Sequence, residues 1–326
     1  MKKVLLATTM LVGGASIAAA EVTLSGNARM GIISNFSDGV AANGDESDVV
    51  FTSRARVVFT MSGESDSGLS FGATFRADNA VEANRGDGGE VFISGAFGKL
   101  SMGDVDGAAQ MATGHVAGVG LTSLGFVNES TFLGAGDGLT DPTALYEYAA
   151  GDFTVYVSVT NPQFSVGSAT TPGQDLTAMA IGAKYSFGDY TIGLGYEKLD
   201  GFLAAAPGVV AFPQADNTDL DHTVLKLSGT VAGVTVQALY GQADGTRAGA
   251  VINNAKQYAA SIGYTTGAIT GTVFYTDDSA ILNGVTAWGI GGSYDLGGGA
   301  KVVGGYAREV NGADSNAFDL GVSFSF

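Results

Sequence analysis

Four arginines lie in three early segments where apolar and polar residues alternate, and they are Arg29, Arg54, Arg56 and Arg76. Successive side chains of a β-strand point to opposite faces, and each arginine shares its parity with Ser, Thr or Asn residues of its own segment. We therefore expect all four guanidiniums on one polar face. A row of fixed cations can sort ions and orient dipolar solutes without making or breaking a bond. The alternative is that the arginines pair with local carboxylates and only stabilise the sheet.

A long connection between the fifth and sixth predicted strands, residues 106–142, could place acidic groups opposite the arginines. Connections of this length usually have a function. Its apolar residues give it enough surface to pack, so we expect it to fold inward and narrow a pore. The acidic candidates lie in this loop or at its base, and they are Asp104, Asp106, Glu129, Asp137 and Asp141. Opposed rows of charge would create a transverse field that admits small polar solutes and hinders apolar ones.

Period-2 alternation recurs along the chain and predicts about 16 strands when segments are counted against the strand template. Every second connection is a tight turn containing glycine, as at 97–99 and 187–189, and the intervening connections are longer. Short turns at one rim, longer loops at the other and an even strand count are typical of a bacterial membrane barrel. The predicted fold is therefore all-β, an antiparallel up-and-down transmembrane β-barrel. It would be a single domain, residues 21–326, with a long pore-constricting loop after the fifth strand.

The predicted faces of the strands agree with a lipid-facing exterior. From Tyr190 to Tyr196 every second residue is large and apolar, whereas the residues between them, and Glu197, would face a polar lumen. Charges are costly on the lipid side, so the inward parity of the arginines supports the same register. Aromatic residues also recur beside the tight turns, where the aromatic girdle of a membrane barrel lies, and these are Phe97, Phe153, Phe187, Tyr190 and Tyr294.

Both ends of the sequence indicate export and membrane insertion. Two lysines precede a short apolar stretch that ends in Ala18-Ala19-Ala20. This is the pattern of a secretory signal peptide, so we expect residues 1–20 to be cleaved off. The last strand, residues 318–326, alternates apolar residues with Asp, Gly and Ser and ends on an aromatic residue. Together the two ends predict a multi-pass barrel in the outer membrane of a Gram-negative bacterium.

Composition excludes several classes of protein. The chain carries 15 Lys and Arg against 32 Asp and Glu, a net charge of −17, which loss of the two N-terminal lysines would change to −19. Such acidity disfavours nucleic acid as a partner. An exported chain without cysteine must be held by hydrogen bonds and packing, which a closed sheet supplies. The 51 glycines are spread along the chain, so neither collagen nor a disordered stalk fits.

The sequence contains no catalytic or cofactor motif. His115 and His222 are isolated, and there is no nucleophile elbow, zinc-protease motif or cysteine nucleophile. We therefore expect no enzyme activity and no cofactor, and we interpret each histidine as solvent-exposed or locally bonded. Acidic stretches at 38–48 and 216–221 leave structural Ca²⁺ in external loops as an alternative, because hard cations favour clustered carboxylates.

Seven blocks along the mature chain resemble the trimeric general-diffusion porins of Gram-negative outer membranes, most closely their alphaproteobacterial branch. The blocks are EVTLSGNARMGI from Glu21, SRARVVFTMSG from Ser53, DSGLSFGATF from Asp66, VFISGAFGKLSMGD from Val91, YSFGDYTIGLGYEK from Tyr185, YDLGGGAKVVGGYA from Tyr294 and the terminal DLGVSFSF. The resemblance implies a barrel of the predicted strand number, a homotrimer around a threefold axis, and a third external loop folded into the lumen as an eyelet.

This resemblance also assigns roles to residues. By position, residues 106–141 would form the eyelet loop opposite the four arginines, and Phe326 would match the assembly signal read by the outer-membrane insertion machinery. The implied function is passive diffusion of small hydrophilic solutes and ions through a water-filled channel, surrounded by outer-membrane lipid and lipopolysaccharide. The alternatives are a substrate-selective channel and, less favoured, an exported β-rich adhesin or structural protein.

Overall fold

The computed structural model describes residues 21–34, 49–78, 87–133, 143–160, 163–165, 174–203, 216–247, 250–278, 280, 285–310 and 315–326. Several sequence predictions fall outside these residues. They are the signal peptide at 1–20, the acidic candidates Asp137 and Asp141, and the acidic stretch at 38–48. The first strand begins at Glu21, directly after the expected cleavage site.

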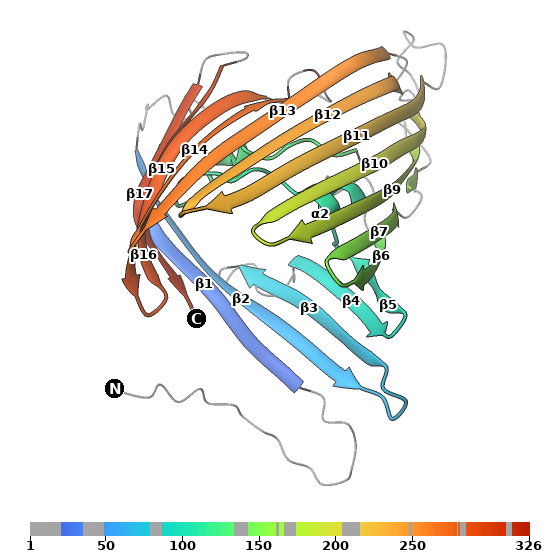
Figure 1. Ribbon diagram of the computed structural model, residues 1–326, viewed down its shortest axis with the longest axis horizontal. Helices are drawn as coiled ribbons and strands as arrows, with labels where there is room; N and C mark the ends of the chain where they lie inside the picture. Colours follow the sequence, from blue (N-terminus) through green and yellow to red (C-terminus); the bar gives the residue numbers. More distant parts are fainter. Residues whose placement is uncertain are drawn as a thin grey trace.

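The described strands form one antiparallel sheet that closes on itself (Figure 1). Its segments are β1 Glu21–Ser34, β2 Val50–Glu64, β3 Ser70–Asp78, β4 Asp87–Gly95, β5 Gly98–Gly103, β6 Thr143–Ala150, β7 Phe153–Thr160, β8 Gln163–Ser165, β9 Gln174–Phe187, β10 Tyr190–Leu203, β11 Asp216–Val231, β12 Val234–Arg247, β13 Ala250–Thr266, β14 Ile269–Asp277, β15 Thr286–Gly297, β16 Ala300–Glu309 and β17 Ser315–Ser325. Pairing of β1 with both β2 and β17 closes the ring. Since β7 and β8 both pair with β9, these 17 segments occupy 16 positions in the wall. The predicted barrel and its strand number are confirmed.

Strand β10 illustrates how alternation sets the two faces. Its outward residues leave 38–51% of their surface exposed, and they are Tyr190, Ile192, Leu194 and Tyr196. The intervening Gly193 and Gly195 are buried inside the barrel, and Glu197 is only 2% exposed. The apolar residues that a soluble protein would bury are thus on the outside, as a barrel dissolved in lipid requires.

Exposed aromatic rings occur at two levels on the outer surface. Tyr190 and Tyr264 lie beside tight turns, and Tyr196 and Tyr258 lie six residues further along the same strands. At a rise of about 3.3 Å per residue, the two levels are roughly 20 Å apart along a strand. Aliphatic side chains fill the outer face between them. Two aromatic levels enclosing an apolar band are the expected boundaries of a bilayer.

The connection between β5 and β6 runs inside the ring of strands, where Figure 1 draws it in teal with the helix α2. We call its described part, residues 104–133, the inner loop. It contains α2, Ala108–Thr113, and a 3₁₀ turn η1, Leu124–Phe126, neither of which the strand periodicity predicted. None of the helices in the described chain is long and apolar enough to cross a bilayer.

The inner loop packs directly on the backbone of the wall. Helix α2 lies against β7, β9 and β10. A Cβ atom at Gly193 would lie 2.2 Å from the carbonyl oxygen of Ala112, and one at Gly182 equally close to that of Ala108. Only glycine permits this approach. Glycines inside these strands therefore allow the loop to pack against the wall.

Candidate functional site

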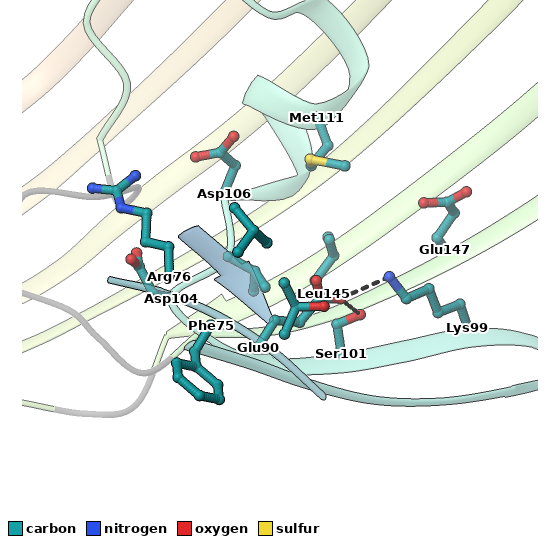
Figure 2. Close-up of a pocket in the computed structure, with 13 residues that line it drawn as sticks. Phe75, Arg76, Glu90, Lys99, Ser101, Asp104, Asp106, Met111, Leu145 and Glu147 are labelled. Carbon is teal, nitrogen blue, oxygen red and sulfur yellow. Dashed lines mark hydrogen bonds and ion pairs between the residues drawn. The ribbon is translucent and has the colours of Figure 1, made fainter. Parts of the chain in front are cut away.

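The inner loop covers one part of the lumen and leaves another part open. After α2 it contacts β16 and β17 through η1, and Leu121 reaches the inner face of β1 and β17 at Gly31 and Gly321. The opposite sector, from β2 to β6, borders a cavity of about 500 Å³ (Figure 2). Side chains of Arg76, Glu90, Lys99 and Glu147 line it from the wall, and Asp104, Asp106 and Met111 line it from the loop.

The predicted arginines lie on the inner face of β1, β2 and β3. Arg29 and Arg54 are directly opposite each other in the register of β1 and β2. Arg54 Nη2 donates to the neutral Oδ1 of Asn27 at 2.9 Å, and Arg29 Nη1 donates to the carbonyl of Leu121 at 3.4 Å. Within the described residues neither guanidinium has a carboxylate partner. Two like charges facing each other in this way destabilise a sheet.

Arg56 behaves differently, because it forms a paired hydrogen bond with Asp78. Its Nε and Nη2 atoms donate to the two carboxylate oxygens, each at 2.6 Å. Arg76 Nε lies 3.9 Å from the same carboxylate. The alternative interpretation of the arginines as local ion-pair partners therefore applies to Arg56. Asp78 was overlooked in the sequence, although it shares the inward parity of Arg76 in the same strand.

Further along the open wall is a second ion pair that the sequence analysis did not single out. Lys99 Nζ lies 2.7 Å from Glu90 Oε1, and Ser101 Oγ donates to the same oxygen at 2.6 Å. The Lys99 ammonium also lies 4.6 Å from the centre of the Phe92 ring. Figure 2 shows this pair at one end of the cavity and Arg76, Asp104 and Asp106 at the other. The sequence signal that could have identified this pair is the inward parity of Glu90 in β4 and of Lys99 in β5.

Three of the predicted acidic residues are exposed in the lumen on the loop side. Asp104 and Asp106 precede α2, and Glu129 follows η1. Although Asp106 is open to the lumen, the protein around it removes part of its hydration and so raises its pKa, and the nearby negative charge of Asp104 raises it further. The pKa of Glu129 is likewise raised, first by burial and then by Asp106. The charge of Asp104 thus acts on Asp106 and that of Asp106 on Glu129, and Asp104 and Asp106 form the acidic side of the cavity.

The site contains no evident apparatus for bond chemistry. No group of three or more His, Asp or Glu side chains that could hold a metal occurs in the described part of the chain. In the acidic stretch at 216–221, Asp219 and Asp221 lie 2.5 and 3.7 Å from Lys198 Nζ. Both histidines are bonded within the fold, His115 to the backbone of Ser130 and His222 to Glu197. The arrangement can separate solutes by charge and size.

The C-terminal residue lies at the seam between the first and last strands. Phe326 N donates to the carbonyl of Gly26 at 2.9 Å, and Gly26 N donates to the carbonyl of Phe326 at 3.3 Å. The aromatic ring itself is 81% exposed. The backbone of Phe326 therefore continues the pairing of β1 with β17.

The family model, the sequence relative and the solved structures that match this chain are all porins. A family model described as Gram-negative porin matches residues 7–314. A porin of Rhodobacter capsulatus is 40% identical over 326 residues, which cover 94% of this chain and all of that protein. A solved porin structure has a TM-score of 0.73 at 35% identity, again over 94% of this chain and 100% of the other. Mutants of Rh. blastica porin, such as one with a TM-score of 0.65 at 22% identity and the same coverage, share the fold.

Proposed function

The chain belongs to the Gram-negative porin family, and from this membership we propose that its solutes pass between the arginine wall and the inner loop. It is a general-diffusion porin of the outer membrane. The observation that supports the proposed path is the open sector from β2 to β6, which is lined by charged side chains and borders the loop. Elsewhere the loop packs against the wall, at β7 and β9 to β11 through α2 and at β16 and β17 through η1.

The charges facing this path support selection by a transverse field. Arg29 and Arg54, which form no ion pair with a described carboxylate, supply positive charge on the inner face of β1 and β2. Asp104 and Asp106 supply negative charge where the loop borders the cavity, and Glu129 adds to it close to Asp106. Because facing guanidiniums cost stability, their presence is better explained by a role in the pore than by support of the sheet. A field of this kind orders water and hinders apolar solutes.

Single-channel recording tests the proposed path. Purified protein added to a planar lipid bilayer should give stepwise currents that rise roughly linearly with salt concentration. Steps in groups of three would support a homotrimer, which we propose from the family resemblance. Replacing Thr74 on the inner face of β3 by Trp should lower the conductance, since this side chain borders the cavity. A matched Trp on the outer face, in place of Leu194, should leave it unchanged, and equal currents from both variants would contradict the path.

A catalytic role is not part of this proposal. The relatives named above are porins, and both histidines of this chain are held in structural hydrogen bonds. We propose that neither residue takes part in a reaction. A substrate-selective channel would differ from general diffusion by saturable block of the current by one sugar or organic anion. We further propose that the signal peptide is removed after Ala20 and that Phe326 acts in assembly with the insertion machinery.

A further inference from the structure

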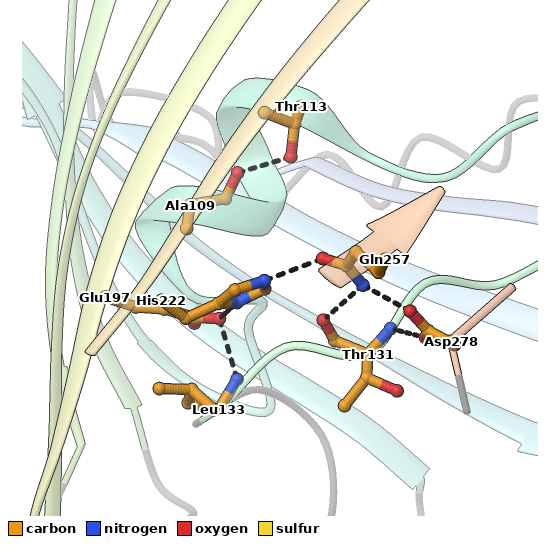
Figure 3. A network of polar contacts seen from close by, with 8 residues as sticks. All are labelled: Ala109, Thr113, Thr131, Leu133, Glu197, His222, Gln257 and Asp278. Atoms are coloured by element: carbon orange, nitrogen blue, oxygen red, sulfur yellow. Dashed lines mark hydrogen bonds and ion pairs between the residues drawn. The ribbon is translucent and has the colours of Figure 1, made fainter. Parts of the chain in front are cut away.

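Four buried polar side chains form a continuous chain along the inner wall, reaching from β10 to the end of β14 (Figure 3). They are Glu197, His222, Gln257 and Asp278, each at most 3% exposed. His222 on β11 and Gln257 on β13 are separated by β12. They meet because β12 has glycine at 241, where a Cβ would lie 2.1 Å from Gln257 Oε1.

Donor and acceptor chemistry fixes the direction of this chain. Asp278 accepts a hydrogen bond from the backbone N–H of Thr131 on Oδ2 and one from Gln257 Nε2 on Oδ1, each at 2.5 Å. The amide nitrogen of Gln257 therefore faces Asp278, and its oxygen faces His222. At 2.7 Å from that oxygen, His222 Nε2 must be the donor.

The other end of the chain needs one more proton. His222 Nδ1 lies 2.7 Å from Glu197 Oε1, which also accepts the backbone N–H of Leu133 at 2.8 Å. A bare ring nitrogen and a bare carboxylate oxygen would repel each other at this distance. One proton is therefore held between them, and all links of the chain are hydrogen bonds.

Both ends of this chain hold the same short segment, residues 127–133, which we call the return arm of the inner loop. Asp278 holds it at Thr131 and Glu197 holds it at Leu133. A third bond runs from Thr276 Oγ1 to the carbonyl of Val127 at 2.8 Å. Glu129 lies within this segment. We propose that His222 is a positioning residue that, through Glu197, Gln257 and Asp278, fixes where Glu129 stands in the pore. This inference rests on the channel function proposed above.

The rest of the inner loop is anchored independently. Lys226 Nζ donates to the carbonyl of His115, and Gln237 Oε1 accepts the N–H of Ala117 at 2.8 Å. Asn128 Nδ2 ties the return arm to the carbonyl of Val116 at 2.8 Å. Loss of His222 should therefore leave the loop inside the barrel and displace only the return arm. The expected consequence is a change of ion selectivity with the channel still open.

Bilayer recordings of His222→Ala and Asp278→Asn test the proposal, with reversal potentials measured in a KCl gradient. Both variants should lower the cation-to-anion permeability ratio by roughly twofold, the scale expected when one charge shifts a few ångströms beside an ion path. Glu197→Gln should lower the ratio as well, because the same oxygen, Oε1, contacts both the N–H of Leu133 and Nδ1 of His222, and an amide cannot serve both while His222 is neutral. Thr230→Ala is the matched control. It removes a hydrogen bond on the same inner face of β11 without touching the loop.

A double variant separates positioning from general damage. In a Glu129→Gln background, His222→Ala should cause no further shift of the ratio, because the charge it positions is absent. An equal shift in both backgrounds would overturn the proposal, as would wild-type ratios in both His222→Ala and Asp278→Asn. If His222→Ala fails to fold, judged by its circular dichroism, Asp278→Asn alone decides. Absence of current from folded wild-type protein would instead overturn the channel function itself.

Discussion

The two sides of the lumen are built from the same alternating strands but carry opposite kinds of side chain. Beneath the inner loop, the wall presents small residues that are almost fully buried, among them Ala243, Ala259, Ala287, Ala307 and Ala317. The open wall presents long charged residues, among them Arg54, Arg56, Arg76, Glu90 and Lys99. Small side chains let a backbone approach the sheet, whereas solvated charges keep it away. Small side chains on inward positions thus make room for the loop, and long charged ones leave room for water.

The largest expected effect is a loss of stability when a methyl group is added to the wall beneath the inner loop. Gly193→Ala places a Cβ 2.2 Å from the backbone oxygen of Ala112, so α2 or β10 must shift. Overpacking of this kind costs roughly 1–3 kcal/mol in the free energy of unfolding. Urea unfolding followed by the fluorescence of Trp288, the single tryptophan, measures this cost.

Gly263→Ala provides the matched control for that substitution. A Cβ at this position has its nearest neighbour at 3.7 Å, an ordinary contact, so stability should remain close to wild type. Equal destabilisation by the two variants would mean that the packing of the inner loop does not depend on small residues in the wall beneath it.

On the open wall, two neighbouring arginines should respond differently to the same change. Arg56→Gln removes both bonds to Asp78 and should lower the free energy of unfolding by about 2 kcal/mol, the scale of charged hydrogen bonds. Arg54→Gln loses only one bond to an amide and relieves repulsion from Arg29, so its stability should stay within about 0.5 kcal/mol of wild type. Both variants should shift selectivity towards cations. Unchanged reversal potentials in a salt gradient would refute a pore-lining role for these arginines.

Lowering the pH should weaken the packing of the inner loop against the wall, because it protonates His115. Burial, and then the charge of Lys226, lower the pKa of His115 from 6.5 to about 4. The neutral ring accepts the N–H of Ser130 at 2.9 Å, which a protonated Nδ1 cannot do. The free energy favouring the packed loop is therefore fully present above pH 6.5 and decreases as the pH falls towards 4. Current fluctuations should increase over this range in wild type and be insensitive to pH in His115→Gln.

The smallest expected effect is a pH dependence of selectivity on the open side. Because the pKa values of Asp106 and Glu129 are raised, these carboxyl groups become neutral at a higher pH than ordinary acidic residues. Lowering the pH should therefore shift the permeability ratio towards anions before the other surface carboxylates titrate. Asp106→Asn should flatten this dependence, and a variant with the wild-type pH profile would show that Asp106 does not contribute.

Alternation in the sequence was sufficient for the parts of the structure that depend on parity alone. It predicted the strand number, the closed sheet and the inward direction of Arg29, Arg54 and Arg76. It could not supply the register between strands, and the register decides that Arg56 meets Asp78 while Arg54 meets Arg29.

The path of the inner loop could not be predicted from alternation either, because residues distant in sequence hold the loop in place. Helix α2 is held by glycines of β9 and β10, and the return arm is held by Glu197 and Asp278. These partners are more than 60 residues away from the loop positions they bind, as with Leu133 and Glu197. Local propensity carries no information about such contacts. The histidines were interpreted as solvent-exposed or locally bonded, whereas His222 is fully buried and bonded to Glu197 and Gln257 on other strands, which only the structure could show.

The seam between β1 and β17 joins the first strand of the sheet to the last, since Gly26 and Phe326 exchange backbone hydrogen bonds. Closure of the ring is thus the strand pairing of greatest sequence separation, and it carries the largest loop-closure entropy cost in the sheet. Until the last strand is delivered, two unpaired edges remain open to pairing with other chains. Because β1 pairs with both β2 and β17, the ring cannot close until the last strand has been synthesised.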